Sequence, residues 1–137
     1  MHLQEDVIVD IPQNRVKFFG TTGKMLLPSA ATIAVLLSQI PASKLLTTVQ
    51  LRQRLTAQFK VAGTCPVTTR KALQALAQDA DGRVPYWRVV NQNGSLITTY
   101  PGGVTGQAAR LQAEGFVIEE GKTARVKNFS ASLAQLA

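Results

Sequence analysis

Two helical patterns separated by a short turn constrain the fold more than any other feature of this chain. In the first, leucine or phenylalanine recurs every four residues, which gives a helix from about Thr47 or Thr48 to Phe59 an apolar stripe. A turn containing Gly63 follows. Pro66 then stands at a favoured first-turn position of a second helix, which runs to about Gln78. The order helix, turn, helix predicts a helix-turn-helix motif.

The polar face of the second helix suits contact with a nucleic acid. Its alanine and leucine positions fall on one side, and threonine, arginine, lysine and glutamine are expected on the other. Helix-turn-helix proteins use such a face for phosphates and base edges. We therefore predict DNA contacts from Thr68, Thr69, Arg70, Lys71 and Gln74, supported by Arg52, Arg54 and Lys60.

The charge of the chain is positive and unevenly distributed. The net charge is +7, and residues 11–78 contain nine lysines or arginines but no aspartate or glutamate. A region of one sign attracts polyanions through its summed field and through counterion release. Positive charge also favours solubility, so the charge pattern alone leaves both interpretations open.

The residue inventory argues against several kinds of site. His2 is the only histidine and Cys65 the only cysteine, which is too few ligands for a structural zinc site, and no phosphate-binding glycine loop is present. We expect no metal and no cofactor. The apolar run Ser29–Ile40 is shorter than the roughly 20 residues of a membrane span, and no secretory signal is visible. With a single cysteine, a cytoplasmic location and no membrane contact are expected.

The remaining segments predict a mainly α-helical single domain. Residues 1–28 carry strand-like patterns at Val7–Val9 and Val16–Phe19, which indicate either a small strand pair or an arm packed on the rest. Residues 29–137 form the predicted domain, and a buried helix capped by Ser29 opens it.

A hairpin wing is expected in the second half of the domain. Val84–Thr99 has Asn93-Gly94 at its turn, so the fold class predicted is a winged helix-turn-helix. A further helix should end at Glu114 before Gly115, followed by pairing of the segments 116–118 and 125–127 and a short terminal helix capped by Ser130.

The segment from Val84 to Gly115 resembles the active-site region of the alkylguanine-DNA alkyltransferases. Members of that family carry Pro-Cys-His-Arg-Val, then Tyr-x-Gly-Gly, and a helix that closes with Glu-Gly. The chain has the frame in the same order: Pro85-Tyr86-Trp87-Arg88-Val89, Tyr100-Pro101-Gly102-Gly103 and Glu114-Gly115. The resemblance covers about residues 44–118 and also aligns Thr68-Thr69-Arg70 with the recognition helix. It implies that Arg70 is the arginine that enters the duplex where a nucleotide is rotated out.

The differences from the family concern its chemistry. Alkyl transfer needs a thiolate, a histidine base and a glutamate that orients the base. Tyr86 stands at the cysteine position, Trp87 at the histidine position, and Val49 replaces a tyrosine of the first helix. An indole has only an N–H donor, and a phenol with a pKa of about 10 is a poor nucleophile. For these reasons we expect the chain not to be an enzyme. Cys65 lies about twenty residues upstream and is not the family nucleophile; a reactive Cys65 at the start of the second helix is the third alternative.

The resemblance is nearest to the alkyltransferase-like proteins, which lack the cysteine and bind alkylated DNA. It implies a monomeric, non-catalytic protein that binds double-stranded DNA, recognises alkylated guanine by base flipping and flags it for a DNA-repair partner. The alternative is a winged-helix regulator or a protein-interaction module without damage specificity. The base pocket that the resemblance implies comprises Tyr86, Trp87, Arg88, Val49, Tyr100, Pro101, Gly102, Gly103 and Glu114.

Overall fold

The computed structural model describes residues 5–78 and 83–135. Its helices are α1 (Val16–Phe19), α2 (Ala30–Leu37), α3 (Thr48–Phe59), α4 (Pro66–Ala77) and α5 (Gly103–Ala113). Single 3-10 turns occur at η1 (Gln13–Arg15), η2 (Tyr86–Arg88) and η3 (Phe129–Ser132). The strands are β1 (Val7–Asp10), β2 (Lys24–Leu27), β3 (Leu46–Thr47), β4 (Gly63–Thr64), β5 (Val89–Val90), β6 (Ile118–Glu119) and β7 (Arg125–Val126).

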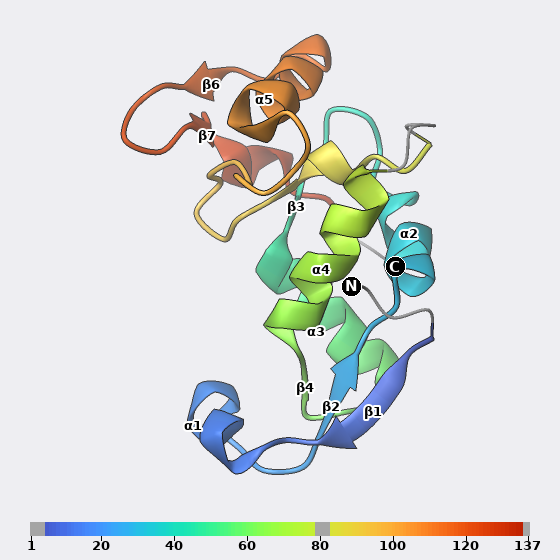
Figure 1. The fold of residues 1–137 in the computed structure, drawn as a ribbon. Helices are drawn as coiled ribbons and strands as arrows, with labels where there is room; N and C mark the ends of the chain where they lie inside the picture. Colours follow the sequence, from blue (N-terminus) through green and yellow to red (C-terminus); the bar gives the residue numbers. More distant parts are fainter. Residues whose placement is uncertain (1–4, 79–82, 136–137) are drawn as a thin grey trace.

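Three small sheets tie distant segments together (Figure 1). In the first, β1 pairs antiparallel with β2, and β2 pairs in parallel with β4, so that Leu26 lies opposite Thr64. In the second, β3 pairs in parallel with β5, and in the third β6 pairs antiparallel with β7. The first sheet therefore joins the N-terminal residues to the turn between α3 and α4.

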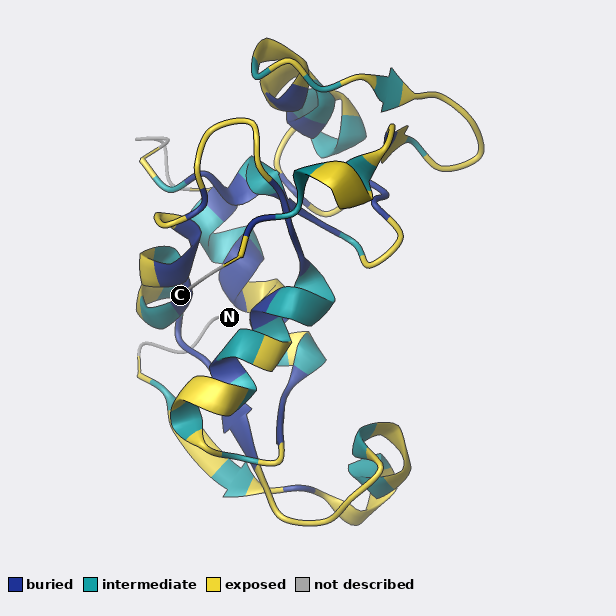
Figure 2. Cartoon of the chain, turned by 180° about the vertical axis from the view of Figure 1, so that it is seen from behind, coloured by how far each residue is buried: buried dark blue, intermediate teal, exposed yellow. Residues whose placement is uncertain are grey.

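The main core lies where α2, α3 and α4 meet. Leu26, Ile33, Leu37, Leu51 and Leu73 are buried there, and Figure 2 shows buried residues in dark blue concentrated in this central part of the cartoon. A second cluster around Leu45, Val90, Leu96, Leu111 and Val126 holds α5 and the β6–β7 hairpin. In residues 5–78 and 83–135, no helix is long and apolar enough to cross a membrane.

Local sequence explains the two helices of the predicted helix-turn-helix. Thr47 and Gln50 form a capping box at the start of α3: the Thr47 hydroxyl accepts from Gln50 N, and the Gln50 side chain accepts from Thr47 N. Lys60 ends α3 in the left-handed conformation. Pro66 is the first residue of α4, where its missing N–H leaves no bond unmade. Both helices are confirmed.

The N-terminal segment differs from its prediction in one element. Val16–Phe19 forms α1 rather than a strand, and Gly20 closes it with a hydrogen bond from its N–H to Val16 O. The partner of β1 is instead β2, in which Met25 and Leu26 are buried. Burial of those two side chains against the core favours β2 over the more exposed Val16–Phe19 segment. In α2, the Ser29 cap is confirmed, but Val35 is 63% exposed.

The predicted hairpin over Val84–Thr99 is wrong. The turn forms, with Gly94 at a φ of 83° and its N–H bonded to Asn91 O. The strand before the turn, however, pairs with β3, and the described residues after it form only an isolated bridge between Ser95 and Arg125. The buried side chain of Gln107 accepts from Ile97 N and donates to Val89 O, so it takes backbone groups that a hairpin would pair.

The C-terminal segments agree with the sequence except at the last turn. The β6–β7 pairing matches the predicted contact between segments 116–118 and 125–127. Asn128, not Ser130, precedes the terminal turn η3. After this turn the chain runs beside Leu45: Leu45 N–H donates to Ser132 O, and Ala134 N–H donates to Leu45 O.

Candidate nucleic-acid interface

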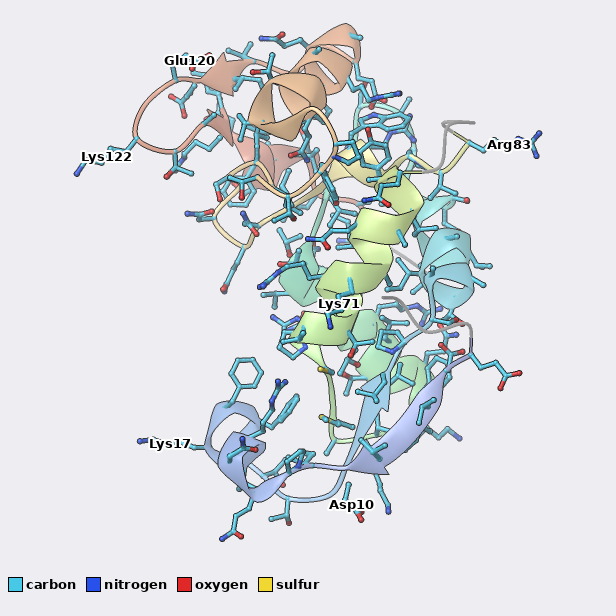
Figure 3. All side chains as sticks on the ribbon, viewed as in Figure 1. Asp10, Lys17, Lys71, Arg83, Glu120 and Lys122 are labelled. Carbon is cyan, nitrogen blue, oxygen red and sulfur yellow. The ribbon has the colours of Figure 1, made fainter. Side chains whose placement is uncertain are left out.

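The outer face of α4 presents two of the five contact residues predicted on this helix fully to solvent. Arg70 and Lys71 are exposed and Gln74 is half-buried; Figure 3 shows Lys71 on the outer side of the helix. Thr68 is half-buried, and its hydroxyl donates to Cys65 Sγ at 3.4 Å. The prediction for Thr69 is wrong, because this side chain is only 2% exposed and its hydroxyl donates to Cys65 O at 2.8 Å. Its position in the first turn turns it toward the core.

Arg70 stands beside a small pocket between α3, α4 and the loop before α5. The cavity volume is about 80 Å³. Arg52 lines it from α3, and Tyr100 and Ile97 line it from the loop. Partial burial lowers the pKa of Arg52; Cys65 opposes this shift, and the nearby Arg70 charge adds to it. Two guanidinium groups therefore bring positive charge to one opening.

The other predicted cations on α3 lie in different surroundings. Lys60 is exposed at the C-terminal end of the helix. Arg54 is half-buried, and its Nε atom is buried without a hydrogen bond. Val49 is half-buried and lines an open groove with Arg52 and Asn91. The structure thus places Arg52 with Arg70 but sets Arg54 beside Gln50 and Gln135 instead.

Tyr86 lies inside the core. It is 6% exposed, and its ring meets Trp87 and Tyr100 edge-to-face with centroids 5.4 and 4.9 Å apart. The Tyr100 hydroxyl donates to Tyr86 O at 3.2 Å. Burial, reinforced by Tyr86, raises the pKa of Tyr100 above its ordinary value, so Tyr100 remains a donor at neutral pH. The three aromatic rings form one packed unit.

Trp87 and Arg88 both contact the carboxylate of Glu114. The indole Nε1 of Trp87 donates to Glu114 Oε2 at 2.8 Å. Arg88 binds the same carboxylate through Nε and Nη2, and its Nη1 donates to Ile40 O at 2.6 Å. Ser43 N–H adds a bond to Glu114 Oε1 at 3.1 Å. Glu114 thereby joins η2, the end of α5 and the loop after α2.

The electrostatics of this cluster keep Glu114 ionised. Burial alone would raise the pKa of Glu114, but hydrogen bonds from Arg88, Trp87 and Ser43 outweigh it and hold the pKa below its usual value. Arg110 lies over the Trp87 ring at 4.6 Å from its centroid, and Arg88 lies at 5.5 Å. The indole N–H of Trp87 is bonded to a carboxylate, and two cations lie near its ring. Because an indole has only a donor, Trp87 has no group that could accept a proton.

Glycines and an overlooked glutamine hold the motif in place. Gly102 and Gly103 both have positive φ at the start of α5, and Pro101 is exposed beside them. Gln107 is 1% exposed and its Nε2 donates to Trp87 O and Val89 O, both at 2.9 Å. Sequence reasoning did not single out Gln107. Its spacing of four residues before the buried Leu111 was the available signal.

Cys65 lies at the start of α4, away from the motif. It is 4% exposed, and Arg15 Nη1 and Thr68 Oγ1 each lie 3.4 Å from its Sγ atom. Burial would raise the pKa of the thiol, but the bonds from Thr68 and the N–H of Val67, together with Arg15, lower it. Among residues 5–78 and 83–135, no cluster of three or more histidine, cysteine or acidic side chains could hold a metal ion.

Fold and site together define a helix-turn-helix protein whose second helix stands next to a Pro-x-x-Arg-Val loop and a Gly-Gly helix start. Residues 28–116 match the family model for the 6-O-methylguanine DNA methyltransferase, DNA binding domain. The match covers more than half of the chain, and the protein belongs to this family. No curated protein sequence matches the chain significantly.

Two solved structures from S. pombe are similar to the fold. One is ATL in complex with DNA, with 20% identity and a TM-score of 0.61. The other is Atl1 in complex with damaged DNA containing O6-carboxymethylguanine, with 22% identity and a TM-score of 0.59. In each case the alignment covers 78% of this chain and 94% of the other. At this identity the likeness concerns the fold.

Proposed function

We propose that this protein is a non-enzymatic DNA-binding protein of the alkyltransferase-like type, which recognises alkylated guanine in duplex DNA and flags it for repair proteins. The observation that carries the proposal is the placement of Arg70. This exposed arginine of α4 borders a pocket with Tyr100 of the Tyr-Pro-Gly-Gly loop, in a chain of the methyltransferase family. The similar S. pombe proteins in complex with DNA support the same interpretation.

The absence of alkyl transfer follows from the residues at the motif. A buried Tyr86 phenol, packed edge-to-face against other rings, occupies the nucleophile position. The only polar atom of the Trp87 side chain, Nε1, donates to Glu114. Neither group can supply a thiolate or remove a proton from one. Cys65 lies in the α4 cap and is in contact with Arg15 and Thr68 instead. The chain therefore keeps the family's arrangement for contacting DNA, but this motif has no group to receive the alkyl carbon.

In the proposed complex, Arg70 enters the base stack while neighbouring cations neutralise phosphates. Lys71 and Lys60 are exposed, and Arg52 shares the Arg70 pocket, so all three suit backbone contacts. Insertion of a side chain stabilises an extruded base by filling its place in the stack. This arrangement predicts binding with a steep salt dependence.

The burial of Tyr86 favours a second candidate, which is DNA binding without damage specificity. The pocket beside Arg70 holds about 80 Å³, whereas small-molecule pockets begin at roughly 300 Å³. A flipped guanine would therefore need the lining of this pocket to move, including Tyr100, whose ring packs against Tyr86. If the lining stays in place, the protein acts as a sequence-reading regulator or a protein-interaction module on the same scaffold.

A binding titration separates the candidates. The full chain is titrated with labelled duplexes that are identical except for one O6-alkylated guanine, at two salt concentrations. The proposed function predicts tighter binding to the alkylated duplex at both. Equal affinity for both duplexes would assign DNA binding without damage recognition, and no binding to either at low salt would refute a DNA-binding role.

Two variants test the role of Arg70 in the same assay. Arg70→Ala should weaken duplex binding by more than the loss of one phosphate contact, which lowers the salt slope by only about one. Lys24→Ala is the control. Lys24 is exposed to solvent, as Arg70 is, but it lies on β2 and is paired with Asp10 of β1. Equal effects of the two variants would contradict a special role for Arg70.

A further inference from the structure

Residues 5–27 form an N-terminal arm that precedes the family match at residues 28–116. The arm consists of β1, η1, α1 and β2, and its sheet continues into β4 next to the start of α4. In Figures 1 and 2, α1 and the β6–β7 hairpin project from the same side of the molecule, and α2 lies on the other. The arm thus adds a surface that the matched domain alone does not provide.

Packing on both helices of the motif holds α1 in place. The Phe19 ring lies over Gly63, where a Cβ atom would come within 2.4 Å of Phe19 Cδ1. Arg15 donates to Cys65 Sγ, the cap of α4. On the α3 side, the guanidinium carbon of Arg52 stands 5.9 Å from the centroid of the Phe18 ring. α1 is therefore connected to the same Arg52 that borders the Arg70 pocket.

The outer surface of α1 combines an exposed ring with positive charge. Phe18 is 60% exposed although Phe19 beside it is half-buried, and the two rings meet edge-to-face at 5.0 Å. Lys17 is exposed and points away from the body of the protein in Figure 3. No acidic residue occurs between Ile11 and Gln78. Phe18, Arg52 and Lys60 also line one groove between α1 and α3.

We propose that α1 is a second contact for duplex DNA, in which Phe18 packs on a base or sugar and Lys17 neutralises a phosphate. This inference rests on the proposed function, and it extends the DNA contact from α4 across Arg52 to the arm. An exposed ring held beside cations is the combination that proteins use to stack on or wedge into nucleic acid. The uniform positive sign of residues 11–78 favours a polyanion over an acidic-basic protein interface.

The test compares variants of the full chain on a labelled duplex of about 20 base pairs, or about two helical turns. Phe18→Ala should weaken binding by at least about fivefold, the effect of losing one stacking contact. Val35→Ala is its control, because Val35 is similarly exposed, at 63%, on α2. Lys17→Gln should reduce the salt slope by about one. Its control is Lys24→Gln, which removes the same charge at a position where the lysine is paired with Asp10.

The outcomes separate this inference from the proposed function. If Phe18→Ala and Lys17→Gln bind like their controls while Arg70→Ala binds weakly, the arm is not a DNA contact and the proposed function stands. If the unmodified protein binds no duplex at low salt, the proposed function itself is wrong. Circular dichroism of each variant verifies the fold, and Phe18→Tyr, which keeps the ring, should retain the affinity of the unmodified protein.

Discussion

Replacing Glu114 with glutamine tests whether the carboxylate links η2, α5 and the loop after α2. The variant Glu114→Gln keeps the size of the side chain, so no cavity forms and the change is confined to charge and hydrogen bonding. The carboxylate accepts from Trp87 Nε1, Arg88 Nε and Nη2, and Ser43 N. A glutamine oxygen can serve only part of this set, and its NH2 group would face the donors of Arg88.

The expected loss follows from the burial of the pair. The side chains of Arg88 and Glu114 are 15% and 14% exposed. Breaking a fully buried pair costs about 3–5 kcal/mol, and one hydrogen bond to a charged group contributes about 1.5–3 kcal/mol. Arg88 keeps its bond to Ile40 O and some contact with water. We therefore expect Glu114→Gln to lower the free energy of unfolding by about 3 kcal/mol and Tm by roughly 10 °C.

Urea unfolding measures this loss with a probe at the site itself. Trp87 is the only tryptophan, so its fluorescence reports on the cluster, and far-UV circular dichroism reports on the helices. Glu119→Gln is the matched control, because Glu119 is exposed on β6 and should change stability by less than about 0.5 kcal/mol. Equal losses in the two variants would refute the reasoning.

A double-mutant cycle isolates the indole contact. Trp87→Phe removes the N–H donor and keeps an aromatic ring near Arg110. Combined with Glu114→Gln and followed by circular dichroism, it should show a coupling energy of about 1 kcal/mol. A coupling of zero would mean that the bond from Trp87 to Glu114 does not stabilise the fold.

Three further predictions concern other parts of the molecule. Because the pKa of Glu114 is lowered in the folded state, its stabilising effect is present above the unfolded value of about 4.3 and is lost as pH falls through the folded value. Acid should therefore destabilise the unmodified protein more than Glu114→Gln in urea unfolding at pH values on either side of about 4.3. Gly63→Ala should destabilise the arm by about 1–3 kcal/mol, because the new Cβ meets Phe19, and faster proteolysis between β1 and β2 would report it. Mass spectrometry after incubation with alkylated duplex should find no adduct on Cys65, since the thiol is buried; a stable adduct would restore an enzymatic role.

The sequence by itself determined the features that depend on short-range rules. Spacing of apolar residues and end signals such as Thr47 and Pro66 located α3 and α4, because helix periodicity and capping act within a few residues. The order of Pro85, Arg88 and Glu114 identified the family frame before any distance was measured. Residue chemistry alone likewise determines that Tyr86 and Trp87 offer neither a thiolate nor an imidazole.

Only the tertiary structure decided which of these side chains are available. Thr69 was expected on the solvent side of α4, but its side chain lies in the core. Tyr86 is buried against Trp87, its neighbour in the chain, and against Tyr100 further along. Val16–Phe19 is a helix, and β1 pairs with β2 instead, because β2 has more apolar surface to bury. The bond from Trp87 to Glu114 spans 27 residues. Such contacts depend on the energy of burial and pairing between distant segments, which local propensity does not contain.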